Sequence, residues 1–110
     1  MEKVNIETAF EKLIAGNRNI YFEVDVVEIQ EQKQTQQGNC FFRIKIKDET
    51  LDAILVVWGS NWNQPNLKIF ETLAPKRIRV IRPRLPSQWA LEQYGVDFWA
   101  DEIRSKIELI

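Results

Sequence analysis

Residues 41–58 show the clearest alternation of apolar and polar positions in this chain. From Phe42 to Lys47 every second residue is apolar and every residue between is basic, a two-residue period that predicts a strand with one buried face and one solvent face. A polar segment at 48–50 leads into the apolar run 53–58, so the two runs are predicted to pair as a β-hairpin. The solvent face of this hairpin carries Arg43, Lys45 and Lys47.

Shorter stretches of the same alternation predict three further strands, at residues 21–29, 77–80 and 96–100. Two long connections interrupt this series of strands. Residues 30–39 are polar and rich in glutamine, and residues 84–95 contain a proline and end on a glycine. Both are therefore predicted to be surface loops, and the first is predicted to be mobile.

Two helices are predicted between the strands. Apolar residues of the segment 6–16 fall on one helical stripe. A shorter helix is predicted to begin at Pro65 and to place Leu67, Phe70 and Leu73 inward.

The resulting order of elements is helix, strand, loop, strand, turn, strand, short helix, strand, loop, strand. This order predicts a mainly β fold, a five-stranded Greek-key barrel with an N-terminal helix and a short helix between strands three and four. We expect one domain over residues 1–110, consisting of a helix at 1–18, the barrel at 20–103 and a C-terminal extension at 104–110.

Charge is unevenly distributed along the chain. The formal net charge is -1, yet six bases stand between Lys68 and Arg84 against a single acid, Glu71. This basic segment is the part of the chain best suited to contact an anion, although the protein as a whole is not basic.

Catalytic and metal-binding chemistry is restricted by composition. The chain has no histidine and Cys40 is its single cysteine, which excludes zinc fingers, histidine-based triads and an intramolecular disulfide. The acids Asp48, Glu49 and Asp52 lie close together, but in a tight turn such residues are typical turn formers rather than magnesium ligands. We expect no catalytic residue, no metal and no cofactor, and hence not an enzyme.

The N-terminus lacks a basic region followed by an apolar stretch, and no apolar run approaches the length of a membrane span. The sequence therefore predicts a soluble cytoplasmic protein without a membrane partner.

The strand segments also support a resemblance to a known family. The matching segments are residues 21–28, 41–48, 53–59 and 94–97. On these segments the chain resembles OB-fold domains of the nucleic-acid-binding type found in replication protein A, single-stranded DNA-binding proteins and anticodon-binding domains. The resemblance implies a five-stranded OB-fold barrel whose binding surface lies on the second and third strands, flanked by the loops 30–40 and 84–95.

Phosphate contacts are predicted from the hairpin bases and from an arginine-rich fourth strand and its exit, namely Arg77, Arg79, Arg82 and Arg84. Base stacking is predicted from Trp58, Trp62 and Trp89, with Phe41 and Tyr94 as further rings. These residues predict non-catalytic binding of single-stranded nucleic acid, with single-stranded DNA favoured over RNA.

Each group also has an alternative role. The hairpin bases could pair with Glu23 and Asp25 across the sheet, and the arginines could form a solvated strand edge. Trp58 could pack in the core, and Trp99 could mark a surface for a partner protein. The alternative function is therefore an OB-fold module for protein interaction, as an accessory subunit of a larger complex or as a homo-oligomer.

Overall fold

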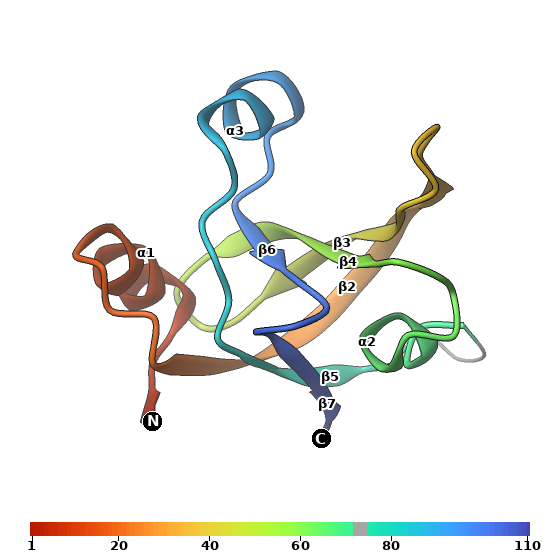
Figure 1. Ribbon diagram of the computed structural model, residues 1–110. Coiled ribbons are helices and arrows are strands. Elements are labelled where there is room, and N and C mark those ends of the chain that lie inside the picture. The colour runs from red at the N-terminus through yellow and green to blue at the C-terminus, as the bar shows by residue number, and fades with distance from the viewer. Residues whose placement is uncertain (72–74) are drawn as a thin grey trace.

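The computed structural model describes residues 1–71 and 75–110, which form one curled β-sheet with three short helices (Figure 1). The strands are β1 (Glu2–Lys3), β2 (Ile20–Gln34), β3 (Cys40–Lys47), β4 (Asp52–Gly59), β5 (Arg77–Ile81), β6 (Phe98–Ala100) and β7 (Lys106–Leu109). The helices are α1 (Ile6–Ile14), α2 (Pro65–Lys68) and α3 (Gln88–Tyr94). None of these three helices is long and apolar enough to cross a membrane.

The sheet curls until its two ends meet. Its strand order is β6-β4-β3-β2-β5-β7, with β1 added in parallel to β2. The first and last strands of this path, β6 and β7, are consecutive in the chain and are joined by residues 101–105. Arg84, which follows β5, also exchanges two backbone hydrogen bonds of 2.7 Å with Trp99 of β6. The edges of the sheet are therefore connected both covalently and by hydrogen bonds.

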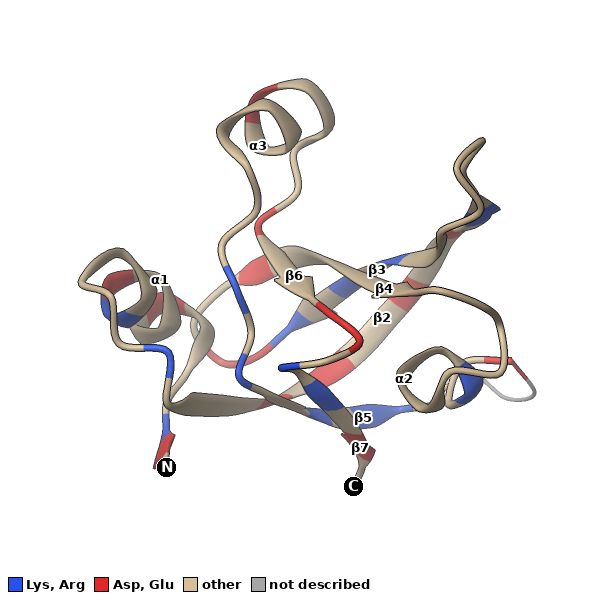
Figure 2. Cartoon of the chain, in the orientation of Figure 1, with Lys and Arg blue, Asp and Glu red and all other residues tan. Residues whose placement is uncertain are grey.

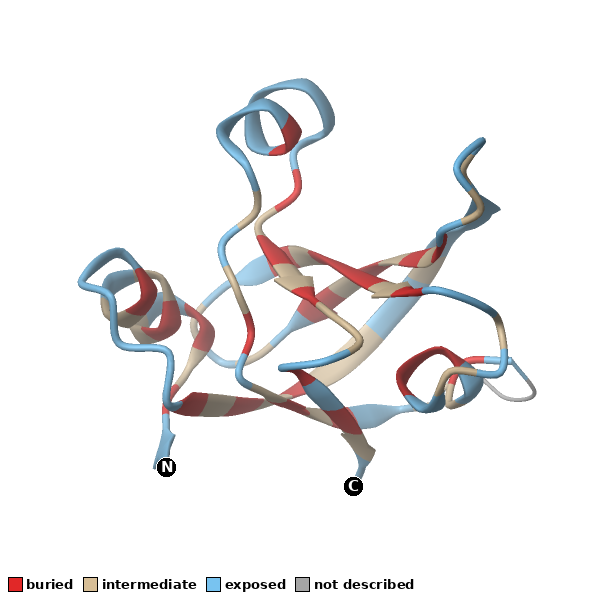
Figure 3. Ribbon diagram, viewed as in Figure 1, coloured by how far each residue is buried: buried red, intermediate tan, exposed pale blue. Residues whose placement is uncertain are grey.

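The inner face of the sheet forms the core, as the two-residue period predicts. On β3, Phe42, Ile44 and Ile46 are buried, while the alternate residues face outward (Figure 3). Phe22 of β2 and Phe98 of β6 are also fully buried. Burial of these apolar side chains is the main source of stability of such a fold.

The two predicted helices cover the core from different sides (Figure 1). Helix α1 begins at Asn5, whose side chain accepts a 2.8 Å hydrogen bond from the Thr8 N–H, and its Phe10 ring stacks on Phe98 with 4.5 Å between centroids. Helix α2 begins at Pro65 as predicted and buries Leu67. The predicted inward residue Leu73 lies outside the described residues.

The predicted count of five strands is wrong in detail, because the last barrel strand is interrupted. Strand β6 pairs with β4, and after the connection 101–105 the chain continues as β7, which pairs with β5. The segment 104–110, predicted as an extension, thus supplies a strand of the sheet and buries Ile107 in the core. Strand β7 has only four residues, and an apolar pattern of this length does not distinguish a strand from a helix.

The two predicted loops also differ from expectation. Strand β2 continues to Gln34, which pairs with Cys40, so most of 30–39 is a long hairpin rather than a loop. This part has exposed side chains on both faces, and a strand exposed on both faces shows no apolar period. The connection 84–95 contains α3, which is capped by the Ser87 side chain at its start and by Gly95 in the left-handed conformation at its end.

Candidate functional site

The three hairpin bases lie on the outer face of β3, and the register places Lys47 opposite Asp25, Lys45 opposite Glu28 and Arg43 opposite Glu31 of β2. Arg43 Nε donates a 2.9 Å hydrogen bond to the Gln30 side chain, and Lys45 Nζ lies 3.8 Å from Asp52, which is an exposed pair. Lys47 ends the strand with an exposed side chain. The alternative pairing of this group with Glu23 and Asp25 is not formed among the described residues, because those acids make their ion pairs with bases on other strands.

The two arginines of β5 form ion pairs with these acids. Strand β5 lies directly opposite β2, so Arg77 pairs with Asp25 at 2.7 Å and Arg79 pairs with Glu23 at 2.9 Å. Lys3 of β1 also contacts Glu23 at 2.8 Å. Hydrogen bonds from Lys3 and Arg79 hold the pKa of Glu23 below its usual range, since they favour the ionised carboxylate. Arg77 and Arg79 therefore have carboxylate partners within the protein, whereas the sequence predicted that they contact phosphate.

Three aromatic rings form a row across the outer face of β3, β4 and β6. Phe41 and Trp58 are direct cross-strand neighbours, with 4.9 Å between ring centroids. Trp58 meets Trp99 edge to face at 6.2 Å. All three rings are partly exposed. The alternative in which Trp58 packs in the core is thus wrong. The row also contains Trp99, which was not predicted from the sequence to be a stacking ring.

A trough of about 730 Å³ runs beside this row. We call it the tryptophan trough, and its lining includes Trp58, Ser60, Trp99, Arg84, Ile103 and Arg104. Two acids also reach it, but both are engaged within the protein. Glu102 accepts hydrogen bonds from the Ser60 N–H and hydroxyl, and Asp101 pairs with Arg84 at 2.8 Å. The trough thus brings aromatic rings and guanidinium groups together in one lining.

A second, smaller hollow of about 370 Å³ adjoins the trough. We call it the arginine hollow, and its lining is Arg18, Asn19, Arg82, Arg84 and Arg104. Arg84 and Arg104 line both spaces, so the trough and the hollow share one wall. Figure 2 shows this basic chain segment after β5 beside the acidic and basic residues of the connection between β6 and β7.

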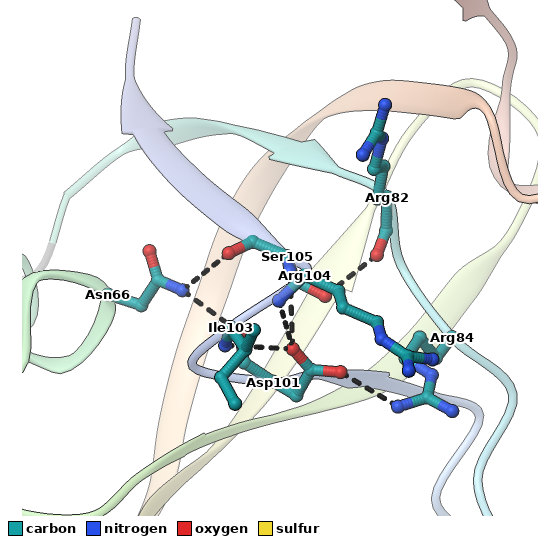
Figure 4. Close-up of polar contacts among 7 residues, drawn as sticks. All are labelled: Asn66, Arg82, Arg84, Asp101, Ile103, Arg104 and Ser105. Carbon is teal, nitrogen blue, oxygen red and sulfur yellow. Dashed lines mark hydrogen bonds and ion pairs between the residues drawn. The ribbon is translucent and has the colours of Figure 1, made fainter.

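Asp101 organises the connection that carries Arg104. One carboxylate oxygen accepts hydrogen bonds from the backbone N–H groups of residues 103–105, and the other binds Arg84 (Figure 4). Partial burial acts to raise the pKa of Asp101, but these bonds outweigh it and the pKa lies below the usual value. Ionised Asp101 thus positions both shared arginines.

Asn66 of α2 supports the same connection from inside. Its side-chain N–H₂ donates to the backbone oxygens of Ser105 at 3.0 Å and Asp101 at 3.3 Å, and its oxygen accepts from the Ile107 N–H at 2.9 Å. Asn66 is only 4% exposed, so these three bonds replace water that the buried groups cannot reach. Figure 4 shows Asn66 facing the connection opposite Arg84.

Comparison with known proteins identifies the architecture. No protein-family model and no curated protein matches the sequence. Among solved structures, the OB domain of protein Ta0387 from Thermoplasma acidophilum, determined by NMR in solution, is similar with a TM-score of 0.59. The identity is 12%, and the match covers 100% of this chain and 88% of that one. The chain has an OB fold. The predicted OB architecture is therefore confirmed at the level of the fold.

In this OB domain the other two predicted tryptophans lie apart from the trough lining. Trp62 packs edge-on against Phe42 at 5.4 Å and is partly buried against the core, so its expected exposure is wrong. Trp89 is 62% exposed on α3 and meets Tyr94 at 5.0 Å. Helix α3 projects away from the barrel (Figure 1).

Sequence reasoning missed Arg18 and Arg104 of the arginine hollow. Each is a single base in a non-repetitive segment, one before β2 and the other between β6 and β7, so neither carries a periodic signal. They come together only because β2, β5 and the β6–β7 connection are neighbours in the OB barrel.

Of the three acids near the turn between β3 and β4, Asp48 binds backbone groups. Asp48 accepts hydrogen bonds from Thr50 and Leu51 of the turn and, at 2.7 Å, from the Ile6 N–H at the start of α1. Among the described residues, no group of three or more histidine, cysteine, aspartate or glutamate side chains is placed to hold a metal ion.

Protonation of Asp48 is expected to destabilise the OB domain. Partial burial acts to raise the pKa of Asp48, but hydrogen bonds from Thr50 and from the Ile6 N–H lower it by a larger amount, so the pKa lies below the usual 3.8. The stabilisation is complete above the unfolded-state pKa and is lost as pH falls through the folded-state pKa. Asp48→Asn should reduce the free energy of unfolding at pH 7 by about 1–2 kcal/mol.

Urea denaturation from pH 7 to pH 2.5 measures this effect. The difference between wild type and Asp48→Asn should shrink once wild-type Asp48 is protonated. Glu49→Gln is the matched control, because Glu49 is exposed in the same turn, and it should change stability by less than about 0.5 kcal/mol. A pH-independent difference between wild type and Asp48→Asn would contradict the prediction.

Proposed function

We propose that this OB domain binds single-stranded nucleic acid in the tryptophan trough, with single-stranded DNA favoured over RNA. The observation that carries the proposal is the row of Phe41, Trp58 and Trp99 beside the guanidinium groups of Arg84 and Arg104. Aromatic faces stack on unpaired bases, and guanidinium groups bind the phosphates that link them.

The state of the trough side chains supports this function. The rings are partly exposed, although burial would have removed more apolar surface from water. Asp101 and Glu102 are held by internal hydrogen bonds, so Arg104 is left to meet an external anion. The outer bases of β3 lie on the same sheet, but each is opposite an acid of β2, so the positive charge of the site comes from the trough arginines.

Single strands are favoured because stacking on a protein ring requires an unpaired base. In a duplex both faces of each internal base are already stacked. The single-stranded DNA-binding proteins that the sequence resembles are the reason for placing DNA before RNA.

Tryptophan fluorescence provides the test. The protein is titrated with a polypyrimidine DNA strand, the matched RNA strand and duplex DNA. With two or three phosphates neutralised, affinity for the single strand should fall about 7- to 20-fold between about 50 and 200 mM salt. Absence of binding to both single strands, checked by anisotropy of labelled strands, would refute the proposal.

A protein-binding role is the second candidate function, supported by α3. This helix leaves Trp89, Leu91 and Tyr94 exposed at 62%, 45% and 56%. Exposed apolar groups of this kind are typical of protein contact surfaces. Loss of a co-purifying partner in Trp89→Ala, together with no strand binding by wild type, would favour this function.

A further inference from the structure

The arginine hollow gathers bases from three separate parts of the chain. Arg18 lies just before β2, Arg82 and Arg84 follow β5, and Arg104 lies in the connection between β6 and β7. Among the described residues, the only other one that lines the hollow is Asn19. Four guanidinium groups thus border a space of about 370 Å³, and none of the described residues that line it is an acid.

The arginines of the hollow differ from those of β5 in their partners. Arg77 and Arg79 each meet a carboxylate of β2. In the hollow, among the described residues, only Arg84 has a carboxylate within ion-pair distance, that of Asp101. Mutual repulsion of the other guanidinium groups is therefore not balanced within the protein, and a bound anion would balance it.

Arg82 has an unusual backbone conformation for an arginine. Its φ is 54°, and it is the only non-glycine residue with positive φ in the described chain. Its N–H donates to the Ile20 carbonyl at 2.9 Å, and its carbonyl accepts from the Ser105 hydroxyl at 2.7 Å. Glycine would adopt this conformation without strain, so an arginine here suggests a role for its side chain, whose Nη2 donates to the Asn19 side chain at 3.4 Å.

We propose that Arg18, Arg82, Arg84 and Arg104 form a binding site for a phosphate monoester dianion, which on a bound strand is its terminal phosphate. The strand part of this inference rests on the proposed function. A terminal phosphate carries a charge of about -1.5 to -2 at pH 7, whereas an internal phosphodiester carries a single charge. Three guanidinium groups without carboxylate partners match the monoester better.

The position of the hollow explains why a strand end would reach it. Arg84 and Arg104 form its wall toward the tryptophan trough, and Figure 4 shows their side chains extending to the same side of the connection. A strand whose last base stacks on Trp99 would therefore place its end beside these two arginines, with Arg18 and Arg82 beyond them.

The test compares one polypyrimidine DNA strand in three forms, with a 5′-phosphate, with a 3′-phosphate and with hydroxyl groups at both ends. One of the phosphorylated forms should bind about tenfold more tightly than the hydroxyl form at equal salt. Arg82→Gly should abolish this preference while retaining the fold, because glycine suits the backbone at this position. Arg18→Gln should reduce it.

Arg77→Gln is the matched control. It removes one positive charge from β5, just before Arg82 in the chain, but the Arg77 guanidinium pairs with Asp25 and does not line the hollow, so the preference for the phosphorylated end should remain. Equal affinity for all three strands would overturn the assignment of the site to a strand terminus while leaving strand binding intact.

Inorganic phosphate distinguishes the two sources of the dianion. A titration followed by NMR of the arginine Nε–H signals is made with inorganic phosphate alone. Shifts at Arg18 and Arg82, together with no strand binding, would support the site but overturn its assignment to a strand terminus. No shift with phosphate and no preference among strands would overturn the site altogether.

Discussion

The double variant Trp58→Ala, Trp99→Ala is expected to bind single-stranded DNA at least about 30-fold more weakly than the wild type. Each ring provides a stacking surface for a base, and base–aromatic stacking contributes about 1–3 kcal/mol per base. Loss of both rings should therefore remove about 2–6 kcal/mol of binding free energy. Fluorescence anisotropy of a labelled polypyrimidine strand measures the change without depending on the tryptophans themselves.

This variant is informative because both rings lie on the outer face. Their side chains are partly exposed on β4 and β6, so their removal leaves the inner core residues in place. Circular dichroism and a denaturation curve should show a folded domain. Trp89→Ala is the matched control, since its ring lies on α3 and does not line the trough.

Three results would distinguish the possible strand-binding surfaces. A large loss of affinity in the double variant with little change in Trp89→Ala supports stacking in the trough. Wild-type affinity in the double variant would exclude the trough as the strand-binding surface. A loss confined to Trp89→Ala would instead place the contact on α3.

Asn66→Ala is expected to reduce the free energy of unfolding by about 3–5 kcal/mol, because it leaves three backbone groups without partners, two of them at buried contacts and one at a part-buried contact. These are the carbonyls of Asp101 and Ser105 and the N–H of Ile107. All three belong to the connection and strand that complete the barrel. The loss should appear in urea denaturation as a lower midpoint with a nearly unchanged slope.

A graded series tests the physical reason. Asn66→Asp keeps an oxygen that accepts from Ile107 but loses both donated bonds, and it adds a buried charge, so it should also be strongly destabilised. Asn63→Ala is the control, since Asn63 is exposed just before α2, and it should cost less than about 0.5 kcal/mol. A loss below about 1 kcal/mol for Asn66→Ala would show that water replaces its bonds.

Asn66→Ala should also affect strand binding in the tryptophan trough. The connection held by Asn66 also carries Arg104 and the carboxylate that binds Arg84. Loosening it should disorder one wall shared by the trough and the hollow. At a temperature where Asn66→Ala is still folded, we therefore expect its strand affinity to fall as well.

How much of the fold could be predicted depended on local patterns. Phe42, Ile44 and Ile46 alternate with bases, and such a period specifies a half-buried strand wherever it is placed in a sheet. The hairpin turn and the caps of α1 are likewise local, because Asp48 and Asn5 bond backbone groups a few residues away. The extended part of β2, with both faces in solvent, had no such pattern and was missed.

The candidate site depended much more on which strands are neighbours. Glu23 could have met the bases of β3, but β3 ends opposite Asp25, and Arg79 of β5 lies directly across from Glu23. Glu23 and Asp25 therefore form ion pairs with the arginine strand, whereas the hairpin bases lie opposite Asp25, Glu28 and Glu31 of β2. Charge counts along the sequence contain no information about this choice.

The sequence by itself determined the inner faces of the main strands, the positions of α1 and α2, and the presence of a basic hairpin, because side-chain period and capping act over a few residues. Only the tertiary structure decided that Trp58 and Trp99 share one outer surface and that Arg18 and Arg104 join Arg82 and Arg84. These groups are far apart in the chain, and they meet because pairing of β6 with β4 and of β7 with β5 brings the ends of the sheet together.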